Sequence, residues 1–185
     1  MCKKADVQTV STEPPAAGRL DPIDWIRRDH DRQLEICHQL ENVVNSSDGD
    51  RVADWAATVL TYLSEELPLH FEDEESDLFP LLLSKPGRSE DLAAVLEQLV
   101  SEHDLDSGLI DPVIEQLRLI ADGKALQNRS RFQACVYTLT AELRRHLNWE
   151  DRVVLPLADK LLTREDRVEL RRKIADRRRI SSTGC

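Results

Sequence analysis

Apolar side chains recur every three or four positions along most of the chain, which is the pattern of amphipathic helices. The first stretch opens with Asp21 as a helix cap and Pro22 at the first helical position, and it ends near residue 46. Further stretches run from about residue 51 to 83, from Ser89 onward, and from about residue 130 to 162. Four long helices joined by short polar breaks predict an all-α fold, an antiparallel up-down-up-down four-helix bundle.

This bundle is expected to span residues 21–162 as one domain. Residues 1–20 are rich in Pro, Ala, Ser and Thr, so we expect them to form a disordered N-terminal arm. Within the third apolar stretch, Gly108 and the Asp111-Pro112 pair interrupt the pattern. The helix is therefore expected to kink or to restart at that point.

Residues 163–185 are expected to form a short basic helix and a tail. Thr163 and Asp166 have the spacing of a capping box, in which each residue bonds the backbone of the other at the start of a helix. The basic run "RRKIADRRR" follows. We expect this run to be a solvated helix face.

Composition narrows the class of protein. The chain has 185 residues, 4% of them aromatic, and a formal net charge of -10, which disfavours binding to nucleic acid or to anionic membranes. Cys37 and Cys135 fall in helical patterns and are expected to be core thiols in a reducing compartment. We find no apolar core of a secretion signal and no run approaching the roughly 20 apolar residues of a membrane span, so we expect a cytoplasmic protein.

One pattern occurs twice, 76 positions apart. "HFEDEESDLFP" begins at His70 and "HLNWEDRVVLP" begins at His146. Each reads H-x-x-x-E, then an acid, then a proline six residues after the Glu. Residues four apart share a helix face, so each His and its Glu can point to one spot. His30 in "RDHDR" and His103 in "SEHDL" extend the repeat, so each half of the chain reads as a pair of helices carrying one His and then His with Glu.

The repeat predicts a site for two metal ions in the bundle core. The donors are four imidazoles and two carboxylates: His30, His70, Glu74, His103, His146 and Glu150. Each ion would take the His pair of one hairpin, or a pair swapped across the bundle, and both carboxylates would bridge. A His on an apolar helix face is usually a structural residue, but burying six polar groups without a counter-charge is costly. Six donors for two ions leave open coordination positions, as expected where chemistry occurs.

The donor types bear on the identity of the metal. Imidazole with carboxylate suits iron, and also manganese or zinc, while the lack of thiolate ligands argues against an iron–sulfur cluster. A ferritin-like site would need Glu-x-x-His twice, and only Glu35 and His38 fit that spacing. We therefore leave His38 out of the site.

At these residues the sequence resembles the hemerythrin family, specifically the hemerythrin-like HHE cation-binding domains. The likeness covers roughly residues 21 to 162 and includes the "LFPLL" and "VLPLA" segments that follow the two Glu residues. It implies a four-helix bundle holding a non-haem diiron centre. In that centre two iron ions are bridged by the two carboxylates and by an oxo or hydroxo group.

Two positions depart from the oxygen-carrying members of that family. Those proteins have a fifth His four residues after the third-helix His, where this chain has Ser107. They also use an Asp five residues after the fourth-helix His as a ligand. Asp151 occupies that place here, but the internal repeat favours Glu150, and a ligand at Asp151 would need a local π-bulge to face inward. Asp151 is therefore kept as the reserve ligand.

The resemblance leaves three classes of function open. The first is a module that binds or senses O2, NO or cellular redox state. The second is iron storage, or iron donation for the repair of iron centres, and the third is a diiron oxidase or peroxidase. A protein redox partner or iron acceptor would fit these classes, and no catalytic residue can be named. Trp149 flanks the His146–Glu150 face as a packing residue or as a neighbour of the ligands, whereas Tyr137 is expected to point away from the site.

Overall fold

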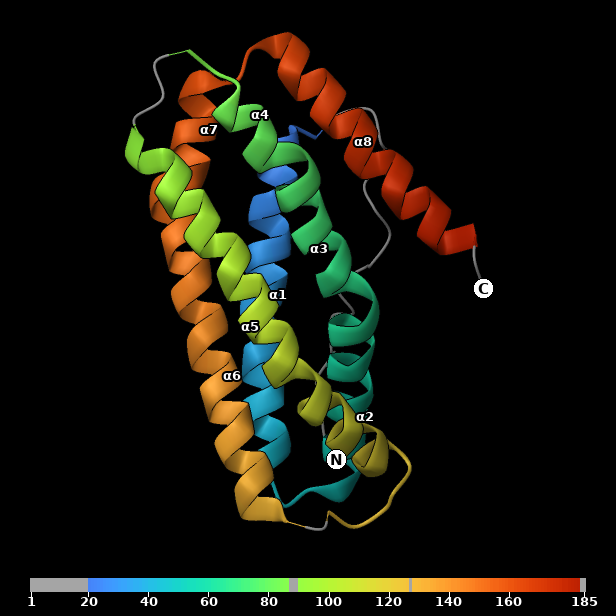
Figure 1. Ribbon diagram of the computed structural model, residues 1–185. Coiled ribbons are helices and arrows are strands. Elements are labelled where there is room, and N and C mark those ends of the chain that lie inside the picture. The colour runs from blue at the N-terminus through green and yellow to red at the C-terminus, as the bar shows by residue number, and fades with distance from the viewer. Residues whose placement is uncertain (1–19, 87–89, 127, 184–185) are drawn as a thin grey trace, which may run out of the picture.

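The computed structural model describes residues 20–86, 90–126 and 128–183, and it places helices and no strand in these ranges (Figure 1). The all-helical class predicted from the sequence is confirmed. The predicted arm at residues 1–20 lies outside the described residues, apart from Leu20. No helix in the described part of the chain is long and apolar enough to cross a membrane.

Four long helical segments lie side by side, and each runs opposite to the one before it (Figure 1). The first is α1 and the third is α5, and the second and fourth are divided by π-helical turns. The elements are α1 (Pro22–Asn45); α2 (Gly49–Thr61), η1 (Tyr62–Glu66), α3 (Leu67–Asp73), η2 (Glu74–Leu78) and α4 (Phe79–Leu83); α5 (Glu90–Ala121); and α6 (Arg129–Trp149), η3 (Glu150–Val154) and α7 (Leu155–Leu161). Both α1 and α5 pack against α2 and α6, so the segments enclose one core.

Local sequence explains where these helices begin. The carboxylate of Asp21 accepts a hydrogen bond from the backbone N–H of Ile23 at 2.9 Å, and Pro22 occupies the first turn, as predicted. Asp48 caps α2 and Asn128 caps α6 in the same way. These side chains satisfy backbone N–H groups that the helices themselves leave without a partner.

Prolines explain the π-helical turns found among the described residues. Each of η1, η2 and η3 is followed by a Leu or Phe and then a proline: Pro68, Pro80 and Pro156. Proline has no N–H to donate and its ring clashes with the carbonyl four residues earlier, so a wider turn before it relieves the helix. The sequence analysis predicted unbroken helices through these positions and considered a π-bulge only as a condition for Asp151 to be a ligand.

The expected restart of the third helix at Gly108 and Pro112 is wrong, because α5 is continuous from Glu90 to Ala121 with Pro112 inside it. Gly108 is the residue whose carbonyl the Pro112 ring approaches, and both residues lie on the exposed face. The opposite face carries Ile110, Val113 and Leu117, all buried. Packing of that face holds the helix together across the proline.

Two apolar clusters fill the described core, one on each side of a polar layer. Leu40, Val59, Leu117 and Leu139 belong to the cluster nearer the α1–α2 connection. The other cluster lies toward α4 and α7, and it includes Ile26, Leu82, Leu96 and Leu155. In α1 the polar layer is marked by His30, between Ile26 of one cluster and Ile36 of the other.

The C-terminal helix α8 (Arg164–Thr183) begins at the predicted capping box. The hydroxyl and backbone N–H of Thr163 both donate to Asp166, and the backbone N–H of Asp166 donates back to the Thr163 hydroxyl. With 20 residues α8 is longer than expected. It lies against α1, α3 and η2, and its Leu170 and Ile174 are buried in the cluster near α4.

The expectation that the basic run is a solvated face holds only in part: Arg172 and Arg179 are exposed, whereas three other basic side chains bond acids of the bundle. Lys173 of α8 bonds Asp77 at 2.8 Å, Arg177 bonds both Asp73 and Asp77, and Arg178 bonds Asp73 at 2.7 Å. These acids come from α3 and η2, beside the polar layer. Acids of α3 and η2 therefore supply the counter-charges, and α8 packs against these two elements.

Candidate metal centre

The polar layer gathers side chains from all four long segments. His30 comes from α1, His70 from α3, His103 from α5 and His146 from α6, while Glu74 and Glu150 begin η2 and η3. Each of the six is at most 2% exposed. The structure thus brings all six predicted ligands together at one level of the core.

These side chains form two overlapping groups in the described chain. His30 and His70 lie with Glu74 and Glu150, and within that group the candidate ligand atoms are within 4.8 Å of one another. His103 and His146 form the second group with the same two carboxylates. Of the two arrangements left open by the sequence, the pairing of histidines within one hairpin is the one the structure places together.

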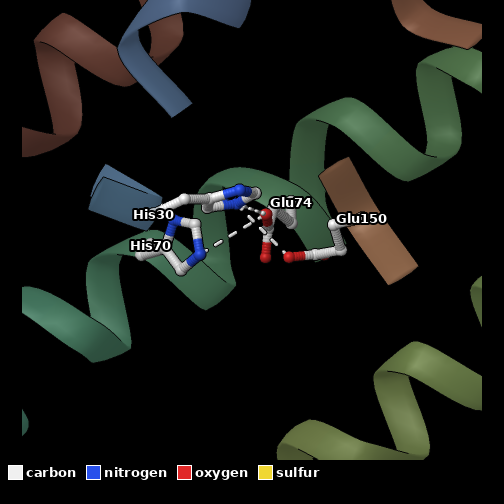
Figure 2. A group of neighbouring side chains, drawn as sticks. All are labelled: His30, His70, Glu74 and Glu150. Carbon is white, nitrogen blue, oxygen red and sulfur yellow. Dashed lines mark ion pairs between the residues drawn. The ribbon is translucent and has the colours of Figure 1, made fainter. Parts of the chain in front are cut away.

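Each carboxylate directs one oxygen toward each group. Oε1 of Glu74 lies 3.6 Å from Nε2 of His30 and 3.5 Å from Nε2 of His70, as Figure 2 shows from the first group. Oε2 of the same Glu lies 3.6 Å from Nε2 of His103. Glu150 is placed likewise, with Oε2 at 3.3 Å from His30 and Oε1 at 3.4 Å from His146. This is the arrangement required of bridging carboxylates.

The outer nitrogens of three histidines have a carboxylate partner. Nδ1 of His30 lies 2.7 Å from Asp151, that of His103 lies 2.6 Å from Glu75, and that of His146 lies 3.1 Å from Glu102. Such contacts fix the ring and its tautomer, leaving Nε2 to face the cluster. Asp151, the reserve ligand, therefore lies on the outer side of His30.

The sequence contained a signal for these outer partners that we did not use. Glu75 and Asp151 are the acids that directly follow the two repeated Glu residues, and each serves a His of the other hairpin. Glu102 directly precedes His103 and serves His146. The repeated acids flanking the ligands thus act as hydrogen-bond acceptors for the imidazoles.

Without metal, the buried groups of the site have pKa values that differ from their ordinary ones. Burial raises the pKa of Glu74 to about 8, and the negative charge of Glu150 adds to the rise. Burial also lowers the pKa of His70 and that of His103. For His146 burial lowers the pKa, but the nearby carboxylates of Glu150, Glu74 and Glu102 together outweigh it and raise the value to about 9. Protons are thus held where cations would otherwise neutralise the carboxylates.

Buried polar atoms without a hydrogen-bond partner show whether the site suits metal cations. Among the described residues, Nε2 of His30 and of His70 and all four carboxylate oxygens of Glu74 and Glu150 are buried and have no hydrogen-bond partner. Leaving such atoms unpaired is costly, and nitrogen and oxygen donors of this kind are ligands for divalent metals. The donor set therefore fits two cations.

The comparison with protein families agrees with this geometry. The family model described as the hemerythrin HHE cation binding domain matches residues 21–158. The chain belongs to the hemerythrin family. A search of curated proteins found no match to it. The resemblance drawn from the sequence is confirmed, and a cation-binding role follows for this hemerythrin-like chain.

Other residues considered from the sequence lie outside the hemerythrin centre. The hydroxyl of Ser107 donates to the backbone carbonyl of His103 at 2.8 Å, so it does not extend the ligand set. Trp149 is 47% exposed, so it is not a core residue. Tyr137 bonds Asn45 at 2.8 Å, and the His38 side chain is 66% exposed. Cys37 is buried as predicted, whereas Cys135 is only half-buried.

The place of Asp151 gives a testable expectation. Replacing Asp151 by alanine should leave two metal ions per chain but weaken binding, because His30 loses the partner that orients its ring. Loss of such a partner costs roughly 10- to 100-fold in metal affinity. Calorimetric titration with zinc measures both quantities, with Asp31→Ala, an exposed acid next to His30, as the matched control. Loss of one whole equivalent of zinc would mean that Asp151 is a ligand.

Proposed function

We propose that this hemerythrin-family chain is a non-haem diiron protein that binds or responds to O2, NO or cellular redox state. His30 and His70 would hold one iron, His103 and His146 the other, and both Glu residues would bridge. The observation that carries the proposal is the division of the two oxygens of Glu74 and of Glu150 between the two histidine pairs. Imidazole with carboxylate is a donor set that iron accepts.

Bound iron would supply a redox change and an open coordination position, and the chain supplies the surroundings. The apolar clusters on both sides of the layer keep bulk water away from it. Asp151, Glu75 and Glu102 hold the imidazole rings so that their Nε2 atoms face inward. The buried Cys37 has its pKa raised to about 12 by burial, so it remains a thiol and takes no part, as suits a protein of the reducing cytoplasm.

A groove supports a small uncharged ligand. It has a volume of about 470 Å³, with Leu63, Leu67, Phe71 and Ile110 on its apolar side and Asp111, Glu115 and Arg118 on its polar side. Phe71 stacks on the His103 ring with 3.9 Å between the ring centroids, so the Phe71 ring lies between the groove and His103. Diatomic gases need no charged or hydrogen-bonding contact to enter such a path.

Ser107 favours a protein that responds to O2 or NO, or that is oxidised by O2, over a reversible oxygen carrier. It stands where the oxygen carriers have their fifth His, and its hydroxyl is bonded to the His103 carbonyl. Both irons would then have open positions. We therefore expect the reduced protein to oxidise quickly in air and to bind NO.

Anaerobic loading with ferrous iron tests the proposal. We expect two irons per chain by elemental analysis, rapid oxidation on stopped-flow mixing with O2, and a new absorption band on adding NO. One iron per chain, or stoichiometric zinc after growth in ample iron, would contradict the diiron centre. A long-lived coloured form that vanishes on argon purging would instead indicate an oxygen carrier, and rapid transfer of iron to a chelating acceptor would indicate iron handling.

A further inference from the structure

The two histidine pairs differ in the contacts of their outer nitrogens. Three outer nitrogens lie 2.6 to 3.1 Å from a carboxylate oxygen, whereas Nδ1 of His70 lies 3.9 Å from Oδ2 of Asp29. Within the described chain, that buried Nδ1 atom has no hydrogen-bond partner. Asp29 precedes His30 as Glu102 precedes His103, so the repeat puts an acid in the corresponding place without completing the bond.

The two halves differ in how an arginine engages the outer acid. Oδ2 of Asp29, the atom that faces His70, accepts a hydrogen bond from Arg178 of α8 at 2.6 Å. In the other half, Glu102 separates its partners. Its Oε1 atom contacts Arg145 at 3.3 Å, which leaves Oε2 for His146. Arg145 and His146 therefore use different oxygens of Glu102. Arg178 and His70, in contrast, face the same oxygen of Asp29.

Arg178 is held firmly in this position. It also bonds Oδ2 of Asp73 at 2.7 Å, and its guanidinium lies 5.3 Å from the centre of the Trp25 ring. Its side chain is 19% exposed. Charge-assisted bonds to two carboxylates and an aromatic contact make this arginine a strong competitor for Asp29.

Withholding the outer partner has a predictable effect on metal binding. A carboxylate bonded to the outer nitrogen of a histidine fixes the ring and makes the inner nitrogen a stronger metal ligand. We propose that Arg178 withholds Asp29 from His70 and so makes the His30–His70 site the weaker of the two metal sites. The inference rests on the proposed pair of metal sites and assigns α8 a role in one of them.

Reciprocity extends the role to α8 itself. If the bond between Arg178 and Asp29 weakens metal binding at His70, metal binding there must weaken that bond by the same factor. Metal binding at the His30–His70 site then loosens α8, while metal binding at the His103–His146 site does not. Metal binding at the weaker site thereby changes how tightly α8 is held on the surface of the bundle.

Zinc titration tests the proposal, because zinc accepts these donors and is diamagnetic. Calorimetry should show two ions with unequal affinities, and 15N spectra of the histidine rings should show His103 and His146 responding to the first equivalent. Arg178→Met should tighten the second ion roughly 10- to 100-fold. Adding Asp29→Ala to that variant should abolish the gain, because the freed carboxylate is then missing.

Lys173→Met is the matched control, since it removes a bond between α8 and Asp77 without touching Asp29. Equal affinities in the unmodified protein, a gain in the Lys173 variant equal to that of Arg178→Met, or a gain that survives Asp29→Ala would overturn the inference. Fewer than two zinc ions per chain would instead overturn the proposed pair of sites. Hydrogen exchange of α8 amides should rise only with the second zinc, and an unchanged rate would overturn the reporting role.

Discussion

Replacing Glu74 by glutamine is expected to reduce the metal content from two ions per chain to at most one. The carboxylate faces both histidine pairs, one oxygen to each, so both candidate sites depend on it. An amide is neutral, and its nitrogen carries hydrogens, so it cannot serve two cations at once. Elemental analysis after loading with excess metal measures the change, and Glu150→Gln should behave alike.

The same substitution should hardly change the stability of the metal-free protein. With its pKa raised to about 8, Glu74 is protonated at neutral pH when no metal is present, and glutamine resembles that neutral acid in size and hydrogen bonding. Glu65→Gln, at an exposed position of η1, serves as the control and should leave both metal content and melting unchanged. Two ions bound to the Glu74 variant with unmodified affinity would refute the bridging assignment.

Removing the metal should lower the melting temperature by about 8 to 16 °C. Ligand at about 1,000 times its Kd stabilises a native state by about 4 kcal/mol, and each kcal/mol shifts melting by about 2–4 °C in a domain of this size. Helix content should be largely retained, since the apolar clusters on both sides of the layer remain. Circular dichroism of chelator-treated and reloaded protein measures both effects, and equal melting would argue against a buried metal site.

The metal-free protein should also lose stability as pH rises from 6.5 to 9. The folded-state pKa of Glu74 is raised from 4.5 to about 8 and that of His146 from 6.5 to about 9, so in this range the folded chain binds more protons than the unfolded chain. The lowered pKa values of His70 and His103 affect stability only below about pH 6.5, the pKa of the unfolded chain, and so lie outside this range. Thermal melts at pH 6.5 and 9 should differ less for the loaded protein, whose ligands carry metal in place of protons.

Helical periodicity and an internal repeat were enough to predict the six side chains that the structure gathers in the polar layer. Spacing of four residues within a helix is local, so His70 with Glu74 and His146 with Glu150 could be read directly. Which acid meets which outer nitrogen could not, because His30 and Asp151 are 121 positions apart and belong to different hairpins. Only the packed bundle decides that pairing.

The role of α8 was missed for a related reason. Its arginines have the local pattern of a solvated face, and their partners lie about a hundred positions earlier, as with Arg178 and Asp73. The π turns, in contrast, had a local signal in Pro80 and Pro156, which we used only to recognise the repeat. In the second and fourth segments a proline thus follows each wider turn, whereas Pro112 stands in α5 without one.

The division of each candidate site between the two hairpins also orders events during biosynthesis. When Glu74 leaves the ribosome, Glu150 is still 76 codons away, which at 5–20 residues per second means a delay of about 4 to 15 s. During that interval the nascent hairpin holds His30, His70 and one of the two shared carboxylates, without Asp151 to orient His30. Both sites become complete only after translation has passed Asp151. Metal could therefore fill the proposed centre completely only after both hairpins have been synthesised.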